Sequence, residues 1–234
     1  SYILNSSSKI CSFIMYKNIY LILLIKIAFM VNEQDAFWKS NFGNEYSKRN
    51  NFDTNYKKRV YEFTKYTSKI TSIDSVLEIG ANIGINLKVL KDFYPNLEQF
   101  AIEINEDAAK SLQNIIPREN IFNESILDIE LDNKFDLILS RGVLIHIHPD
   151  NLKNTYEKIY KYSKKYKLIS EYFNPEPLEV SYRGYNDKLF KRDFCKDLME
   201  TYNDLKLIDY GFLYNGDSEY RLDDLNWFLL EKTK

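Results

Sequence analysis

Apolar positions follow two alternating patterns along this chain. Runs of mostly apolar residues at 76–80, 99–104, 135–140 and 166–173 are typical of strands buried on both faces. Between these runs, apolar residues spaced three and four apart predict helices, such as the one that carries Leu87 and Leu90 and stops before Pro95. Strands that alternate with helices from residue 76 to 170 predict a parallel sheet with helices on both faces.

Segments on either side complete the expected architecture. A short strand is expected at 121–125, and two last strands at 205–214 and 225–232 bring the sheet to seven strands. Ahead of the sheet, Val60, Phe63 and Tyr66 lie at helical spacing. We therefore expect an α/β fold with a seven-stranded, mostly parallel, Rossmann-like sheet over residues 73–234 and a helical N-terminal cap over residues 30–72.

The first 29 residues form a separate region. Ser1 to Phe29 contain no acidic residue, and the apolar run from Ile19 to Phe29 is interrupted by Lys26. A membrane-spanning helix needs about 20 mostly apolar residues, and no small-residue cleavage site of a signal peptide follows the run. We interpret residues 1–29 as sequence upstream of a natural start at Met30, with a membrane anchor as the alternative.

Composition narrows the classes of function. A chain of 234 residues that is 44 % hydrophobic and 28 % charged fits one globular domain with an appendage. Its net charge of −2 gives no chain-wide positive field for nucleic acid or anionic lipid. Cys11 and Cys195 are too few for a disulfide framework, which indicates a reducing cytoplasm. No cluster of His, Asp and Glu has the spacing of metal ligands, so we expect no metal.

The first strand-to-helix turn is the expected ligand site, because ligands of open α/β sheets bind at the carboxyl ends of the strands. It reads VLEIGANIG and places Glu78, Gly80 and Gly84 in an E-x-G-x-x-x-G spacing. A dinucleotide site would have a glycine where Asn82 stands, and Glu78 would repel a pyrophosphate. A carboxylate here suits a ligand with an amino group or a sulfonium, which favours S-adenosylmethionine over a nicotinamide cofactor.

Residues after the next strands extend this site. Glu103 ends the second strand, where its carboxylate can accept hydrogen bonds from both hydroxyls of a ribose. Ser125, Ile126 and Asp128 follow the third strand at the expected place of an adenine edge, and the fourth strand ends near the expected methionine moiety. The residues expected to bind the cofactor are Glu78, Gly80, Ala81, Gly84, Glu103, Ile104, Ser125, Ile126, Arg141 and Gly142.

These motifs resemble those of a known superfamily. Over residues 76–145, VLEIGANIG, AIEI and FDLILSRGVLIHI resemble motifs of class I S-adenosylmethionine-dependent methyltransferases. From about residue 32 to the C-terminus, FWKSNFGNEYSKRN, GVLIHIHPD and EYFNPEPLEVSYRGYNDKLFKRDF are similar to the pseudaminic acid biosynthesis-associated methylases. The resemblance implies methyl transfer to a small sugar-type acceptor in the synthesis of nonulosonic acids for bacterial surface glycans. It leaves the acceptor, its reacting atom and the oligomeric state open.

Methyl transfer from a sulfonium is an in-line displacement, so the protein has to align the reactants, exclude water and, for a hydroxyl acceptor, remove a proton. Both histidines of the chain, His146 and His148, follow the fourth strand. His146 is the expected general base or acceptor-orienting group, and packing beneath a lid is its alternative. His148 precedes Pro149 and is expected in a turn.

The long segment after the fifth strand, residues 171–194, is expected to bind the acceptor, because long loops of compact domains usually carry function. Tyr172 and Arg183 are the candidate catalytic residues in it, and Arg183, with Lys191 and Arg192 nearby, suits a carboxylate or phosphate of the acceptor. Aromatic residues of the cap are expected to close the cofactor pocket, namely Trp38, Phe42 and Tyr46.

Two further functions stay open. The run from Lys158 to Lys167 mixes lysine with tyrosine, which favours RNA binding and makes RNA methylation an alternative. A non-catalytic S-adenosylmethionine-binding module is another, and it would form no S-adenosylhomocysteine with any sugar. The expected partner is a small sugar, with neither nucleic acid nor membrane unless residues 1–29 are an anchor.

Overall fold

A computed structural model describes residues 33–233 of the chain, and the predicted leader over residues 1–29 lies outside them. The centre is a seven-stranded sheet in the order β3-β2-β1-β4-β5-β9-β8. Its strands are β1 (Ser75–Ile79), β2 (Glu98–Ile102), β3 (Ile121–Phe122), β4 (Phe135–Arg141), β5 (Ser163–Glu171), β8 (Leu205–Leu213) and β9 (Leu225–Lys232). Pairs among β1 to β5 are parallel, and β9 is antiparallel to β5 and β8. The predicted seven-stranded, mostly parallel sheet is confirmed.

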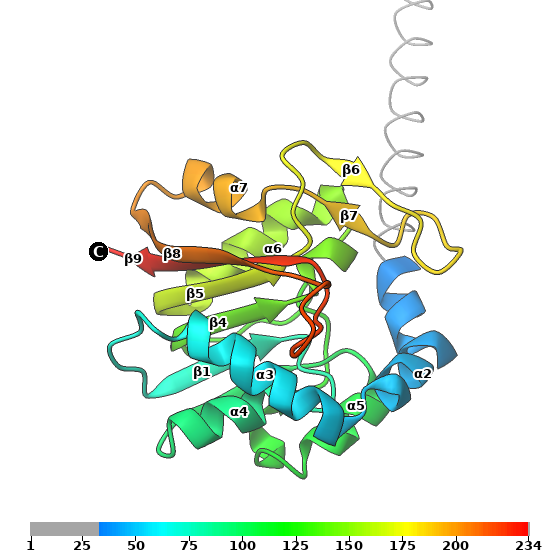
Figure 1. Ribbon diagram of the computed structural model, residues 1–234, viewed down its shortest axis with the longest axis horizontal. Coiled ribbons are helices and arrows are strands. Elements are labelled where there is room, and N and C mark those ends of the chain that lie inside the picture. Colours follow the sequence, from blue (N-terminus) through cyan, green and yellow to red (C-terminus); the bar gives the residue numbers. More distant parts are fainter. Residues whose placement is uncertain (1–32, 234) are drawn as a thin grey trace, which may run out of the picture.

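Helices cover both faces of the sheet (Figure 1). On one face lie α3 (Phe52–Tyr66), α4 (Ile85–Phe93) and α5 (Glu106–Leu112), and on the other lie α6 (Pro149–Tyr162) and α7 (Phe194–Thr201). Short 3₁₀ helices occur at η1 (Arg118–Asn120) and η2 (Leu144–His146), and a small two-stranded sheet pairs β6 (Leu178–Glu179) with β7 (Phe190–Lys191). None of the helices within residues 33–233 combines the length and apolar character that crossing a bilayer requires.

Successive strand side chains explain why the strands are apolar throughout. In β1, Val76 packs into the cluster beneath α3 and α4, whereas Leu77 packs into the cluster beneath α6 and α7. Both side chains are fully buried, because adjacent residues of a strand point to opposite faces and both faces are covered. The unbroken apolar runs in the sequence follow directly from this two-sided burial.

The predicted cap over residues 30–72 divides into two parts. Residues 33–39 are helical, and together with α2 (Asn41–Arg49) they lie over one end of the sheet beside α5 (Figure 1). In contrast, α3 is a core helix, since Phe63 and Tyr66 are fully buried against the sheet. Helical periodicity identified the apolar face of α3 but not the surface that it covers. We call residues 33–49 the lid.

Candidate functional site

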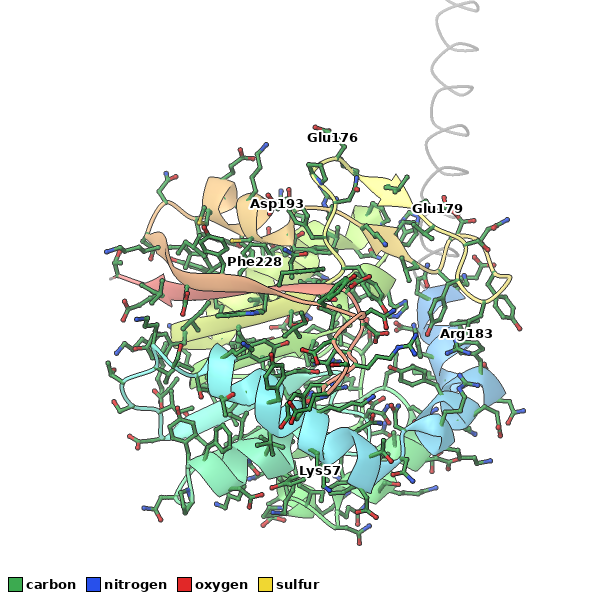
Figure 2. All side chains as sticks on the ribbon, in the orientation of Figure 1. Lys57, Glu176, Glu179, Arg183, Asp193 and Phe228 are labelled. Atoms are coloured by element: carbon green, nitrogen blue, oxygen red, sulfur yellow. The ribbon has the colours of Figure 1, made fainter. Side chains whose placement is uncertain are left out.

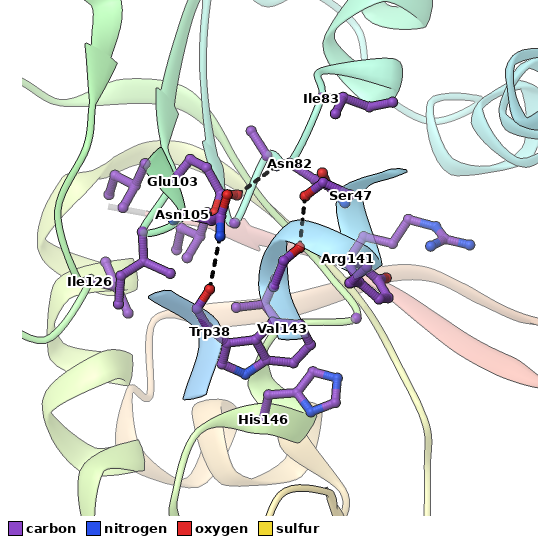
Figure 3. A pocket seen from close by; sticks show the side chains of 18 of the residues that line it. Trp38, Ser47, Asn82, Ile83, Glu103, Asn105, Ile126, Arg141, Val143 and His146 are labelled. Atoms are coloured by element: carbon purple, nitrogen blue, oxygen red, sulfur yellow. Dashed lines mark hydrogen bonds between the residues drawn. The ribbon is translucent and has the colours of Figure 1, made fainter. Parts of the chain in front are cut away.

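A pocket opens at the carboxyl ends of β1, β2 and β4, where the strand order reverses between β1 and β4 (Figure 3). Open α/β sheets bind their ligands at such a switch point. Predicted cofactor residues that line the pocket are Gly80, Ala81, Glu103, Ile104, Ser125, Ile126, Arg141 and Gly142. The lid closes the opposite side with Trp38, Gly43 and Tyr46.

Glu103 is held rigidly at the end of β2. Its Oε2 accepts a hydrogen bond from the amide of Asn82 at 2.7 Å, and its Oε1 accepts one from the amide of Asn105 at 2.8 Å. Burial raises the pKa of Glu103, and these amides partly oppose the shift. Each carboxylate oxygen has a second lone pair, so the arrangement remains able to accept the hydroxyls of a ribose.

The glycine turn is shaped by packing as well as by ligand access. Gly80 lines the pocket at φ +67°, and a Cβ there would stand 2.6 Å from Cγ2 of Val143. Gly84, at φ +82°, does not line the pocket, and a Cβ there would stand 2.9 Å from Leu112 of α5. Gly84 therefore lets α4 start close against α5, and its predicted contact with the cofactor stays a prediction. Asn82 occupies the left-handed region at φ +49°.

Glu78 also lies outside the pocket lining, behind Asn86, and its predicted contact with the cofactor stays a prediction. It is fully buried, and its Oε1 accepts a hydrogen bond from Asn86, which does line the pocket. Burial raises the pKa of Glu78 to about 8. Within residues 33–233, three buried oxygens of pocket-lining residues have no hydrogen-bond partner, namely Gln34 Oε1, Asn82 Oδ1 and Asn86 Oδ1. Unpaired acceptors of this kind suit a ligand that brings ammonium and amino donors.

Two arginines and one glutamate form a charged wall beside the turn. Arg141 pairs with Glu62 through Nε at 2.7 Å and Nη2 at 2.9 Å, and Arg59 also donates to Glu62. Burial alone would raise the pKa of Glu62, but the two guanidinium groups outweigh burial and lower it. Both arginines line the pocket. The wall therefore holds one uncompensated positive charge, which fits the carboxylate of a methionine moiety.

Ser125 and Ile126 line the pocket at the predicted place, but Asp128 is exposed and lies outside the lining. The acid next to Ser125 is instead Asp35 of the lid, whose Oδ1 accepts a hydrogen bond from the Ser125 hydroxyl at 3.2 Å. Burial raises the pKa of Asp35. The lid thus supplies the carboxylate at the expected adenine edge.

His146 lies in η2, directly after β4. Its Nδ1 is 2.7 Å from the carbonyl oxygen of Lys188, so Nδ1 carries the proton and Nε2 keeps a free lone pair. Burial lowers the pKa of His146 to about 4, which leaves the ring neutral at pH 7. His148, in contrast, caps α6 and accepts a hydrogen bond from the amide of Asp150.

The η2 segment is anchored by Glu171 at the end of β5. Its Oε1 accepts hydrogen bonds from the amides of Val143 and Leu144 at 3.1 Å and from the Ser140 hydroxyl at 2.9 Å. Burial raises the pKa of Glu171 to about 7, and the amides partly oppose the shift. This carboxylate fixes the backbone that carries His146.

Aromatic rings surround His146 at the pocket mouth. Its ring centroid is 4.7 Å from Trp38 and 4.9 Å from Tyr182. Trp38 also packs on Tyr46 at 5.4 Å, and Phe42 lies 5.9 Å from Tyr182. The lid and the segment between β6 and β7 therefore meet over the pocket. We call these four rings, Trp38, Phe42, Tyr46 and Tyr182, the aromatic cage.

The other candidates in the long loop lie around this cage. Tyr172 is half-buried and does not line the pocket, although it lies close enough to Tyr46 and Tyr182 for each to raise its pKa beyond the effect of burial. Arg183 is exposed, with its guanidinium 5.8 Å from the Tyr182 ring. Arg192 forms an ion pair with Asp197 at 2.6 Å, so its charge is already compensated and it is not a free cation for the acceptor beside Arg183.

Sequence reasoning missed Arg59, Glu62, Asp35 and Glu171. Arg59 and Glu62 belong to a helix that we had assigned to a cap, and Asp35 stands well before the first strand. Only Glu171 carried a signal, since it is an acid near the end of the strand predicted over residues 166–173. Within residues 33–233, no group of three His, Cys, Asp or Glu residues is arranged to hold a metal ion.

Replacing Glu103 with alanine is expected to weaken cofactor binding by about 10- to 100-fold, since hydrogen bonds to charged groups contribute about 1.5–3 kcal/mol each. The variant also frees the amides of Asn82 and Asn105 from their acceptor. Isothermal titration with S-adenosylhomocysteine measures the change. Asp128→Ala is the matched control, because this exposed acid lies outside the lining, and an equal loss in both variants would refute the specific role of Glu103.

Comparison with known proteins agrees with this geometry. Residues 77–165 match the family model described as a methyltransferase domain. No curated protein matches the sequence at a significant level.

Solved structures share the fold. Burkholderia thailandensis 1,6-didemethyltoxoflavin-N1-methyltransferase has a TM-score of 0.66 at 16 % identity, over 87 % of this chain and 91 % of that chain. Magnesium protoporphyrin IX methyltransferase from Synechocystis PCC 6803 has a TM-score of 0.62 at 11 % identity, over 87 % and 99 %. A plantazolicin methyltransferase has a TM-score of 0.59 at 14 % identity, over 89 % and 99 %. All three were solved with S-adenosylhomocysteine.

At these identities the similarity establishes the fold. The matched segment adds the type of domain, because it runs from β1 to the start of β5 and so spans the turn, Glu103 and His146. Residues 77–165, which are less than half of the chain, match a methyltransferase domain, and the described residues have the fold of solved S-adenosylmethionine-dependent methyltransferases; the two findings together support an enzyme that transfers methyl groups.

Proposed function

We propose that the chain methylates a small sugar-type acceptor that enters between the lid and the segment joining β6 to β7. The observation that carries this is the aromatic cage, which stands over His146 at the pocket mouth. Apolar faces of sugar rings pack on aromatic side chains, while ring hydroxyls need nearby polar partners such as tyrosine hydroxyls. The assignment to pseudaminic acid synthesis in the cytoplasm rests on the sequence resemblance and on the low cysteine content.

Each part of the pocket has a task in this reaction. The bound cofactor supplies a methyl group on a sulfonium. Glu103 would hold its ribose, the wall of Arg59, Glu62 and Arg141 would hold its carboxylate, and Asp35 with Ser125 would contact its adenine. His146 would accept the acceptor's proton at Nε2, since Nδ1 is committed to the Lys188 carbonyl. The lid excludes water and keeps the reactants aligned.

The test is formation of S-adenosylhomocysteine by the purified full chain. Free nonulosonic acids, their nucleotide-linked forms and their precursor sugars are offered in parallel with single-stranded RNA. We expect turnover with at least one sugar and none with RNA. Methylation of RNA would replace the proposal with the RNA alternative, and cofactor binding without turnover on any sugar would favour the non-catalytic module.

A pair of variants separates the two possible roles of His146. His146→Asn is expected to keep a donor near the Lys188 carbonyl but lose Nε2, and to lower kcat by about 100-fold if proton transfer is the task. His146→Gln offers a polar atom near the Nε2 position but breaks the Nδ1 contact. A purely structural histidine predicts the opposite result, with His146→Asn close to the parent enzyme. Single-turnover rates with saturating cofactor measure the difference.

A further inference from the structure

Two arginines each lie close to rings of the aromatic cage. The Arg49 guanidinium lies 5.6 Å from the Phe42 ring and 5.9 Å from the Tyr46 ring, at the end of α2. The Arg183 guanidinium lies 5.8 Å from the Tyr182 ring, and Figure 2 shows Arg183 beside the lid. Phe42 and Tyr182 are themselves in contact, with centroids 5.9 Å apart. One continuous set of rings therefore connects the two cations.

The two cations also act on the same phenol. Burial raises the pKa of Tyr182, while Arg183 and Arg49 both act to lower it. Both guanidinium groups therefore lie within electrostatic range of the Tyr182 hydroxyl, at the mouth of the pocket rather than in its lining.

The described residues 33–233 provide no carboxylate partner for these arginines. Neither Arg49 nor Arg183 forms an ion pair within residues 33–233. Glu45, the acid of α2, pairs with Lys48, and Glu179 accepts the amide of Asp187. The first 32 residues contain no Asp or Glu. Two cations that lie near the same phenol and have no carboxylate partner within the described residues fit the recognition of an anionic ligand.

The cofactor is not that anion. Its carboxylate has a nearer partner in the wall formed by Arg59, Glu62 and Arg141, inside the pocket. Arg49 and Arg183 do not line that pocket. An anion held there belongs to the molecule that approaches from the mouth, which is the acceptor.

We propose that Arg49 and Arg183 clamp an anionic group of the acceptor, a carboxylate or a phosphate, while the aromatic cage packs on its ring. This inference rests on the proposed function, and it narrows the acceptor from any small sugar to a negatively charged one. The guanidinium fork forms paired hydrogen bonds with either group. Because Arg49 belongs to the lid and Arg183 to the β6–β7 segment, the anion would also bridge the two pieces that cover the pocket.

Direct binding tests the clamp without requiring turnover. The full chain is saturated with S-adenosylhomocysteine and titrated with two probes, N-acetylneuraminic acid for a carboxylate and uridine diphosphate for a phosphate. We expect one probe to bind the parent protein and to bind at least about tenfold more weakly to Arg49→Gln and to Arg183→Gln. Lys48→Gln, which removes a neighbouring cation of α2, is the matched control and is expected to bind as the parent does.

The probe titrations distinguish failure of the clamp from failure of the proposed function. Failure of both probes to bind, or unchanged binding in both arginine variants, would overturn the clamp. Arginine-dependent binding of a probe together with no methylation of any sugar would keep the clamp and refute the proposed function. Once an acceptor is known, the variants should raise its KM with little change in kcat, and should not affect an uncharged ester or dephosphorylated analogue.

Discussion

Replacing Gly80 with alanine is expected to weaken cofactor binding by more than about 30-fold, and replacing it with arginine is expected to abolish binding. A Cβ at this position would stand 2.6 Å from Val143 Cγ2, and φ is +67°. Backbone strain of this kind costs about 1–3 kcal/mol, and about 1.4 kcal/mol corresponds to a tenfold change in affinity. The displaced Val143 would also disturb the segment that leads into His146.

Gly184 provides the matched control for this prediction. It has φ +86°, but a Cβ there would meet nothing within 4 Å. Gly184→Ala therefore introduces similar strain without the collision, and we expect cofactor affinity close to that of the parent. Titration calorimetry with S-adenosylhomocysteine measures both variants. Equal losses of affinity would show that backbone strain, rather than the collision with Val143, is responsible.

Replacing Glu62 with glutamine is expected to destabilise the fold by about 3–5 kcal/mol, because Arg59 and Arg141 would remain buried without a counter-charge. In a domain of this size such a loss lowers the melting temperature by about 10 °C. Glu45→Gln is the control, since its pair with Lys48 is exposed and we expect little change. Calorimetric melting curves test the pair, and a Glu62→Gln variant as stable as Glu45→Gln would contradict the predicted role of the wall.

Acid sensitivity gives a second measure of the same wall. The pKa of Glu62 in the folded protein lies below its ordinary value of 4.5. Its contribution to stability is therefore complete above pH 4.5 and declines as the pH falls through the lower folded pKa. The Glu62→Gln variant should lack this part of the acid-induced loss, which denaturant titrations between neutral and acidic pH resolve.

Sequence patterns were sufficient for the sheet and for most of the strand-end residues that line the pocket. The first turn and Glu103 are predictable because residues at strand ends converge on one edge of a parallel sheet. Glu78 and Gly84 lie outside the pocket lining for a related reason. Spacing shows that a residue belongs to the turn, but its direction depends on contacts with Asn86 and with α5 that lie elsewhere in the chain.

The contacts between distant segments were not predictable. Asp35 meets Ser125, and His146 is held by Lys188, across 90 and 42 residues of chain. These pairs depend on how the lid and the β6–β7 segment fold back over the pocket. No periodic pattern encodes that geometry, because both pieces are short and largely polar.

Because α3 contributes Phe63 to the core and Arg59 to the pocket, it cannot vary freely without disturbing the domain. The lid lines the pocket but contributes no residue to the two hydrophobic core clusters. It is held in part by single side-chain hydrogen bonds, such as those that Asn105 donates to Trp38 and Asn44. The sheet and α3 therefore tolerate little change, whereas the lid can be exchanged with less effect on the core. Transplanting residues 33–49 together with 172–189 between homologous enzymes should transfer acceptor preference, and cofactor affinity should be kept where the transplanted lid retains Asp35, which contacts Ser125 in the cofactor pocket.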